Sequence, residues 1–213
     1  MKRPRVIMAD DHAMLVDALS RVVEPEFEVV ETVGDGRALL AAAEKHRPDV
    51  IIVDVSMPLL NGVEATRQIK KADPRVKVII LTMHESSQFA TQAFEAGASG
   101  YLLKHSASEE LIQAIREVLK GRHYVTPLIA KDVMQDLMEK RDRSDHPAQA
   151  LSTREREVLQ LLAEGKAMKE VAAVLNISTK TVEFHKYNIT RKLELRTTAE
   201  LTRYAIKHGI VSS

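Results

Sequence analysis

Short β-rich runs alternate with helical patterns through the first half of this chain, and this alternation limits the fold more than any other feature. Three of the five runs are almost continuously apolar, as expected for strands that are covered on both faces. The runs are residues 5–10, 27–33, 49–55, 77–82 and 100–104. Helical spacing is found in residues 14–23, 38–45, 62–71, 88–96 and 107–120. Five strands that alternate with five helices predict a doubly wound parallel α/β sheet with helices on both faces.

The second half of the chain predicts a different architecture. Residues 1–121 form the expected sheet domain, and residues 122–149 have the composition of a linker that contains a short amphipathic helix. From residue 150 to residue 213 only helical patterns remain, and either Ser152 or Thr153 can cap the first of four helices. We therefore expect an all-α domain after the linker.

Charge is distributed unevenly between these parts. The chain of 213 residues has a net charge of +1, but residues 1–130 carry −2 and residues 151–213 carry +4. A basic tail is typical of a domain that binds nucleic acid. The absence of cysteine excludes disulfide scaffolds, iron–sulfur sites and cysteine nucleophiles. The apolar start of the chain is too short for a signal peptide, and no apolar run is long enough to span a bilayer, so we expect a cytoplasmic protein.

Polar side chains stand at the ends of four predicted strands. Asp10 and Asp11 end the first strand, Asp54 the third, Thr82 the fourth and Lys104 the fifth. Ligands of open parallel sheets bind beyond the carboxyl ends of the strands, so these side chains should meet at one edge. Each of these residues alone would be interpreted as a surface charge or a helix cap, but their joint placement at the strand ends predicts a common site.

Three carboxylates close together call for a divalent cation, and oxygen ligands suit Mg²⁺. A carboxylate beside the cation can act as a nucleophile towards phosphorus. Lys104 and Thr82 would then contact the phosphoryl oxygens, and the chemistry implied is an aspartyl phosphate on Asp54.

These residues resemble the receiver domain of bacterial two-component response regulators over residues 4–121. The similarity lies in the acidic pair, the segment DVSMPLLNG at 54–62, ILT at 80–82 and GYLLK at 100–104. The resemblance implies a flavodoxin-like fold with strand order 2-1-3-4-5 and a histidine kinase as phosphoryl donor. The site residues that it implies are Mg²⁺ ligands from the Asp11 and Asp54 side chains and the Ser56 backbone carbonyl, supported by Asp10, and a switch made of Thr82 and Tyr101. His105 departs from the pattern, since many receivers have proline there.

The third predicted helix of the tail has two distinct faces. With Val182 facing the core, Ile189 and Leu193 fall within about 20° of it at about 100° per residue. The opposite face carries Lys180, Glu183, Tyr187 and Arg191, with Phe184 and Thr190 beside it. Long polar and aromatic side chains on one face suit a helix that lies in a major groove.

The tail resembles the LuxR/NarL-type DNA-binding domain over about residues 150–212. The most specific segments are TREREVL, KEVAAVLNIS and KTVEFH, while Ala167 stands where serine or threonine often begins the second helix. The resemblance implies a helix-turn-helix whose helix around 180–193 enters DNA, and a last helix that pairs two copies as a homodimer. The candidate DNA-contacting residues are Lys180, Thr181, Glu183, Phe184, Lys186, Tyr187, Arg191 and Lys192, of which Lys186 and Lys192 stand where phosphates would pass.

Together these features predict a DNA-binding response regulator in which phosphorylation of Asp54 controls dimerisation or releases the tail. Three other interpretations remain. The first is an enzyme with an aspartyl nucleophile, for which a second acid is expected where Ser56 stands. The second is a constitutive DNA-binding regulator that does not depend on phosphorylation. In the third, the basic helical tail is a protein-interaction domain.

Overall fold

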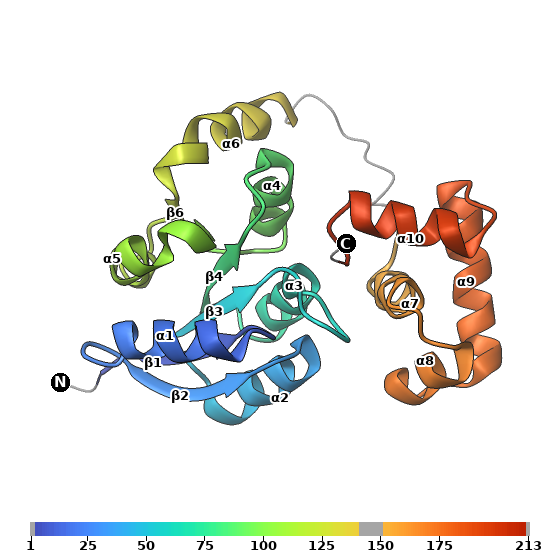
Figure 1. The fold of residues 1–213 in the computed structure, drawn as a ribbon, viewed down its shortest axis with the longest axis horizontal. Helices are drawn as coiled ribbons and strands as arrows, with labels where there is room; N and C mark the ends of the chain where they lie inside the picture. Colours follow the sequence, from blue (N-terminus) through green and yellow to red (C-terminus); the bar gives the residue numbers. More distant parts are fainter. Residues whose placement is uncertain (1–2, 141–150, 212–213) are drawn as a thin grey trace.

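The computed structural model describes residues 3–140 and 151–211. Its sheet is parallel, with the strand order β2-β1-β3-β4-β5-β6 (Figure 1). The order of the first five strands confirms the flavodoxin-like prediction. The strands are β1 (Arg5–Ala9), β2 (Glu28–Val33), β3 (Val50–Asp54), β4 (Lys77–Thr82), β5 (Gly100–Leu103) and β6 (Tyr124–Val125). Because all neighbours are parallel, the carboxyl ends of β1, β3, β4 and β5 meet at one edge.

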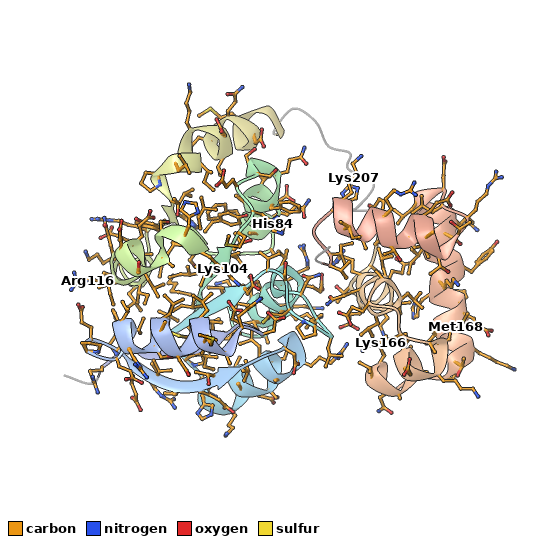
Figure 2. All side chains as sticks on the ribbon, viewed as in Figure 1. His84, Lys104, Arg116, Lys166, Met168 and Lys207 are labelled. Atoms are coloured by element: carbon orange, nitrogen blue, oxygen red, sulfur yellow. The ribbon has the colours of Figure 1, made fainter. Side chains whose placement is uncertain are left out.

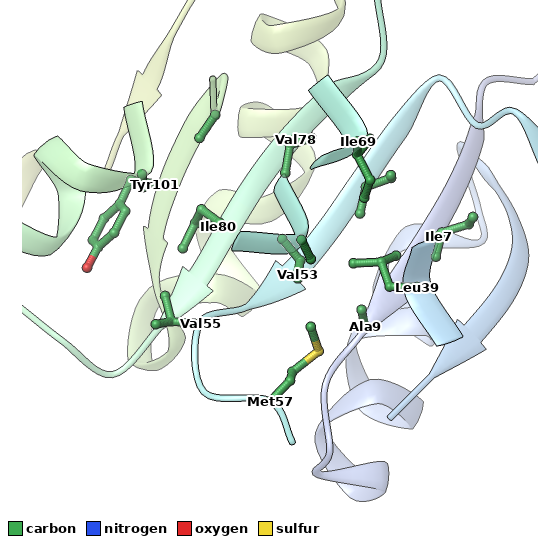
Figure 3. Packing of buried hydrophobic residues seen from close by; sticks show 14 of the residues in the cluster. Ile7, Ala9, Leu39, Val53, Val55, Met57, Ile69, Val78, Ile80 and Tyr101 are labelled. Carbon is green, nitrogen blue, oxygen red and sulfur yellow. The ribbon is translucent and has the colours of Figure 1, made fainter. Parts of the chain in front are cut away.

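Alternating side chains of the strands build two cores, one on each face of the sheet. One face packs Val53, Ile80 and Tyr101 against helices α2, α3 and α4 (Figure 3). The opposite face packs Ile52 and Leu102 against helices α1 and α5. The helices are α1 (Ala13–Val23), α2 (Gly36–His46), α3 (Gly62–Ala72), α4 (Ser87–Glu95) and α5 (Ala107–Leu119).

The sequence interpretation missed two short elements. The sixth strand, Tyr124–Val125, pairs with β5 in a segment that we expected only to end the preceding helix. Two residues are too few to show an alternating pattern, so this strand had no periodic signal. Lys104–Ser106 form a 3-10 turn, η1, where His105 departs from the receiver pattern.

The linker helix is α6 (Pro127–Lys140), as the amphipathic pattern predicted. Its residues Ile129 and Val133 are buried in the core on the α4 side of the sheet, and Figure 1 shows α6 beside α4. Leu128, Met134 and Met138 on its other side are exposed. The polar stretch RDRSDHPAQA that we interpreted as a linker lies outside the described residues.

The tail consists of four helices around a core of its own. Ser152 caps the first of them, and its hydroxyl and the Glu155 carboxylate bond reciprocally to backbone N–H groups. Ala167 supplies no capping side chain to the second, but the Glu170 carboxylate accepts a hydrogen bond from the Ala167 N–H at 2.7 Å. The helices are α7 (Thr153–Ala163), α8 (Met168–Leu175), α9 (Thr179–Leu193) and α10 (Thr198–Lys207).

The helical tail lies against the sheet domain, with α7 and the end of α10 facing α3 and α4 (Figure 1). Arg156 of α7 donates to the carboxylate of Glu64 at 2.6 Å, and Gln68 of α3 donates to Glu157 at 2.9 Å. Glu64 is only 3% exposed, and the guanidinium of Arg156 supplies the opposite charge at this contact. Among the described residues, no helix combines the length and the apolar character that a membrane span requires.

Candidate functional site

The predicted side chains at the strand ends meet in one acidic site. Lys104 Nζ lies 2.7 Å from Asp10 Oδ2 and 3.1 Å from Asp54 Oδ2. Figure 2 shows Lys104 among the side chains of the sheet domain. Asp10 and Asp54 are buried, whereas Asp11 at the rim is 39% exposed. The structure thus brings together the carboxylates and the lysine from β1, β3 and β5, with Thr82 at the end of the neighbouring β4.

Burial and charge act in opposite directions on the two central groups. Burial raises the pKa of the Asp54 carboxyl above its ordinary value, and the positive charge of Lys104 offsets only part of this rise. Burial lowers the pKa of Lys104, but the hydrogen bond to Asp10 and the attraction of Asp54 outweigh it, so the pKa is raised overall. Lys104 therefore stays charged beside the carboxylates.

The donor set fits a hard divalent cation. One ligand atom from each of Asp10, Asp11, His12 and Asp54 lies within 4.8 Å of the others. Carboxylate oxygens are the ligands that Mg²⁺ takes, usually one or two of them together with water. The loop after Asp54 begins with Val55 and Ser56, so the Ser56 backbone lies next to the same site.

His12 is a member of this cluster that the sequence interpretation missed. Its Nδ1 lies 3.0 Å from Asp10 Oδ1 and 2.9 Å from Asp11 Oδ1. The hydrogen bond to Asp10 and the charge of Asp11 raise the pKa of the imidazole. Its position directly after the acidic pair was the available signal.

Thr82 and Tyr101 are connected through the loop that follows β4. Thr82 is buried, and its hydroxyl accepts a hydrogen bond from the His84 N–H at 3.1 Å. The Tyr101 ring is fully buried, and its hydroxyl donates to the His84 carbonyl at 2.9 Å. Burial raises the pKa of the Tyr101 phenol, so it is a hydrogen-bond donor at neutral pH. Both side chains thus bond to the backbone of the same residue, His84.

Helix α9 has the two faces that its spacing predicted. Val182 and Ile189 are buried in the tail core, and Leu193 packs against them. Phe184 and Tyr187 are 61% and 60% exposed. Lys180, Glu183, Arg191 and Lys192 are also exposed, and Thr181 and Lys186 are half-buried. This outer face is open to solvent although the tail contacts the sheet domain.

Two of the predicted DNA-contacting residues make contacts within the tail. Lys192 Nζ lies 2.7 Å from Oε2 of the buried Glu155. Thr181 donates its N–H to the Ser178 hydroxyl at 3.1 Å and so belongs to the cap of α9. Lys192 and Thr181 therefore make stabilising contacts within the tail that the helical spacing alone did not predict.

Two family models match the chain, one over each part. The response regulator receiver domain matches residues 6–116, which contain the acidic site. The bacterial regulatory proteins of the luxR family match residues 149–205, which contain α9. The chain is a response regulator of the LuxR family. It is therefore a DNA-binding response regulator of a two-component system, and the fold and both motifs agree with this assignment.

Known proteins of this family resemble the chain over nearly its whole length. The oxygen regulatory protein NreC of Staphylococcus epidermidis is 39% identical over 215 residues, covering 97% of this chain and 99% of NreC. A structure of the RcsB response regulator of Salmonella typhimurium has a TM-score of 0.65 at 29% identity, covering 98% of this chain and 99% of that one. A structure of two RcsB dimers bound to two parallel DNAs has a TM-score of 0.59 at 27% identity and covers 97% and 99% of the two chains.

Proposed function

We propose that Asp54 accepts a phosphoryl group and that this modification controls DNA binding by the tail. The observation that carries the proposal is the position of Lys104, which contacts both Asp10 and Asp54 at the carboxyl edge of the sheet. A charged ammonium beside a carboxylate nucleophile is the arrangement that phosphoryl transfer requires.

In the proposed reaction an oxygen of the Asp54 carboxylate forms a bond to phosphorus. The bond from phosphorus to the donor breaks, and the leaving group keeps its electron pair. The leaving atom is a histidine nitrogen when a sensor histidine kinase is the donor and an acyl oxygen when the donor is acetyl phosphate. Lys104 and the Thr82 hydroxyl stabilise the phosphoryl oxygens as charge moves onto them.

Asp10, Asp11 and Asp54, with the Ser56 carbonyl, would hold Mg²⁺. When it is bound, the cation neutralises the carboxylates and the incoming phosphoryl charge. The protein's own contribution is the fixed position of the Asp54 oxygen and of the Lys104 ammonium. We expect no turnover of an independent substrate, because the proposed product stays on Asp54.

The output domain of residues 150–213 would bind double-stranded DNA through the outer face of α9, as a homodimer on paired half-sites. The receiver of residues 1–121 would control it through the linker of residues 122–149. The RcsB structure that contains dimers and DNA supports both parts of this proposal. A protein of this class would work in the cytoplasm, where its DNA and its kinase are accessible.

Labelling of the full chain by acetyl phosphate in the presence of Mg²⁺ tests the proposal. The wild type should gain one phosphoryl group, detected by intact mass or by a phosphate-affinity gel, and Asp54→Asn should gain none. Labelling of Asp54→Asn at the wild-type level would refute Asp54 as the acceptor. Phosphorylated protein should also bind promoter fragments more tightly than unphosphorylated protein, and equal binding would favour the constitutive alternative.

A further inference from the structure

His12 faces both members of the acidic pair with one ring nitrogen. Its Nδ1 atom lies 3.0 Å from Oδ1 of Asp10 and 2.9 Å from Oδ1 of Asp11. Nδ1 of an imidazole carries at most one hydrogen, and a single N–H cannot point straight at two oxygens. Without that hydrogen Nδ1 offers a lone pair, which is a common ligand for metal ions. A cation that the nitrogen shares with a carboxylate therefore suits this arrangement better than one hydrogen bond does.

The distances between these atoms match those of neighbouring ligands around a small divalent cation. Nitrogen and oxygen ligands lie about 2.0–2.2 Å from such ions. Two of them at right angles around the ion are therefore about 2.8–3.1 Å apart. The distance of 2.9 Å from His12 Nδ1 to Asp11 Oδ1 falls in this range. A carboxylate oxygen of Asp54 lies within 4.8 Å of both atoms, close enough to bind the same ion.

Asp10 fixes the position of His12 and does not supply a free ligand of its own. Its Oδ1 accepts a hydrogen bond from the backbone N–H of His12 at 2.9 Å, and its Oδ2 lies 2.7 Å from Nζ of Lys104. Both oxygens of this buried carboxylate are thus engaged within the protein. Asp11 at the rim is 39% exposed, so its carboxylate is open to an entering cation. His12 Nδ1 is the next ligand that such a cation meets.

The position of His12 at the start of α1 does not explain the direction of its ring. It stands at the cap position of the helix, where serine, threonine, asparagine or aspartate would bond a backbone N–H group of the first turn. The His12 side chain makes no such bond and contacts the acidic pair instead. Its side chain is 68% exposed, so a hydrated ion can reach Nδ1 from solvent, and water can accept the hydrogen on the opposite ring nitrogen.

We infer that His12 is a metal ligand that makes the acidic site select among divalent cations. The inference rests on the Mg²⁺ site of the proposed function. Mg²⁺ prefers carboxylate, carbonyl and water oxygens and gains little from an imidazole. Co²⁺, Ni²⁺ and Zn²⁺ accept imidazole nitrogen and bind such mixed sites more tightly than Mn²⁺ does. An ion of this group takes His12 Nδ1 in place of a bound water and competes with Mg²⁺ for Asp11 and Asp54.

The test titrates the full chain, freed of metal, separately with Co²⁺ and Mg²⁺ in a weakly alkaline buffer, followed by isothermal titration calorimetry. His12→Phe keeps a ring but removes the ligand. It should weaken Co²⁺ binding about tenfold or more, as other changes at metal ligands do, and should change Mg²⁺ binding by about twofold or less. His105→Phe is the matched control, because His105 is exposed directly after Lys104 but does not belong to the cluster. It should bind both ions as the wild type does.

Asp11→Asn shows whether both ions occupy the acidic site, since it should weaken the binding of Co²⁺ and of Mg²⁺ alike. Proton NMR spectra of the Co²⁺-loaded chain identify the ligand directly. The unpaired electrons of Co²⁺ move the signals of a coordinated imidazole far outside the ordinary range. These signals should be present in the wild type and in His105→Phe and absent from His12→Phe.

Four outcomes would overturn the inference. In the first two, His12→Phe loses no affinity for Co²⁺ or loses affinity for both ions equally. In the others, the Co²⁺-loaded wild type shows no shifted imidazole signals, or these signals persist in His12→Phe. The wild-type spectrum decides the matter even if a variant does not fold. Neither measurement needs a phosphoryl donor, so a wild type that acetyl phosphate and Mg²⁺ fail to label would refute the proposed function without affecting this test.

Discussion

The Nζ atom of Lys104 lies 3.1 Å from Oδ2 of Asp54 and connects the ends of β5 and β3, two strands that are separated in the sheet by β4. The contact exists only because every strand runs in the same direction, so that distant parts of the chain end at one edge. It places one positive charge between carboxylates that would otherwise repel each other.

Lys104→Met should separate catalysis from cation binding. The substitution removes the charge that stabilises the phosphoryl oxygens, so labelling by acetyl phosphate should slow by about 10²- to 10³-fold, as for other groups that stabilise developing charge. Mg²⁺ should bind more tightly, because the ammonium that faces Asp10 and Asp54 no longer repels it. Isothermal titration calorimetry measures the second effect. Wild-type labelling together with unchanged Mg²⁺ affinity would contradict both expectations.

Asp54→Asn should stabilise the fold at neutral pH when divalent cations are removed by a chelator. The folded-state pKa of Asp54 is raised above 3.8, so its contribution to stability is favourable below that pH and is lost as the pH rises through the folded-state pKa. Each unit of elevation corresponds to about 1.4 kcal/mol.

The difference in melting temperature between Asp54→Asn and the wild type should therefore be small near pH 3.8 and should widen above it. Thermal unfolding followed by circular dichroism gives both curves. A wild type that is the more stable protein at pH 7 would contradict the burial argument.

Lys192 has two competing roles, and one substitution tests both. Lys192→Met leaves Glu155 buried without its partner, which should destabilise the tail by about 1 kcal/mol or more at pH 7. Burial raises the pKa of Glu155, but the hydrogen bonds to Lys192 and Ser152 outweigh it and lower the pKa below 4.5. The Glu155 carboxylate therefore stabilises the folded state above pH 4.5, and this contribution is lost as the pH falls through its folded-state pKa.

The deficit of Lys192→Met should accordingly shrink below pH 4.5. A variant that keeps wild-type stability at pH 7 but loses affinity for DNA would show instead that Lys192 acts at phosphates, as its position on the helix predicted. Denaturant titration and fluorescence anisotropy with labelled DNA give the two measurements.

The sequence predicted the role of a residue correctly where that role follows from its position in its own helix or strand. Asp10, Asp54, Thr82 and Lys104 stand at strand ends, and parallel topology alone brings strand ends together. Val182 and Ile189 were placed in the core by helical period, which holds within one helix.

The contacts that the sequence did not predict join elements whose relative placement no local pattern determines. Gln160 falls in an amphipathic helix where a glutamine is typical of a solvated position, and only the docked receiver makes it buried. Glu155 lies in the first turn of α7, and its pairing with Lys192 depends on how α7 packs against α9. Leu59 lies in a loop of one domain and packs into the core of the other.

The outer face of α9 should carry the affinity for DNA. Tyr187→Ala and Lys180→Ala each remove an exposed side chain from this face without disturbing the core that Val182 and Ile189 form. Each should cost about 1–3 kcal/mol if it reaches a base, and Lys180→Ala should reduce the salt dependence of binding by about one unit of slope if it contacts a phosphate.

Lys120→Ala is a matched control for charge, because Lys120 is exposed on the receiver and pairs with Glu117. It should leave DNA binding unchanged. Wild-type affinity of both α9 variants, with the far-ultraviolet circular dichroism spectrum unchanged, would place the reading surface elsewhere on the tail.

Gly62 is required because the first turn of α3 passes directly over the backbone of the phosphoacceptor. A Cβ at position 62 would lie 2.0 Å from the Asp54 carbonyl oxygen and 3.0 Å from Cγ2 of Val53, both of which belong to the buried β3. Neither atom is at the end of a flexible side chain, so the strand or the helix must shift. Gly62→Ala should therefore destabilise the receiver by about 1–3 kcal/mol, the usual cost of overpacking a core, and should also slow labelling of Asp54. Gly34→Ala is the control, since the nearest atoms to its Cβ lie 4.0 Å away. Calorimetric unfolding of the two variants should show a lower receiver transition for Gly62→Ala alone, and equal transitions would mean that β3 and α3 can separate without cost.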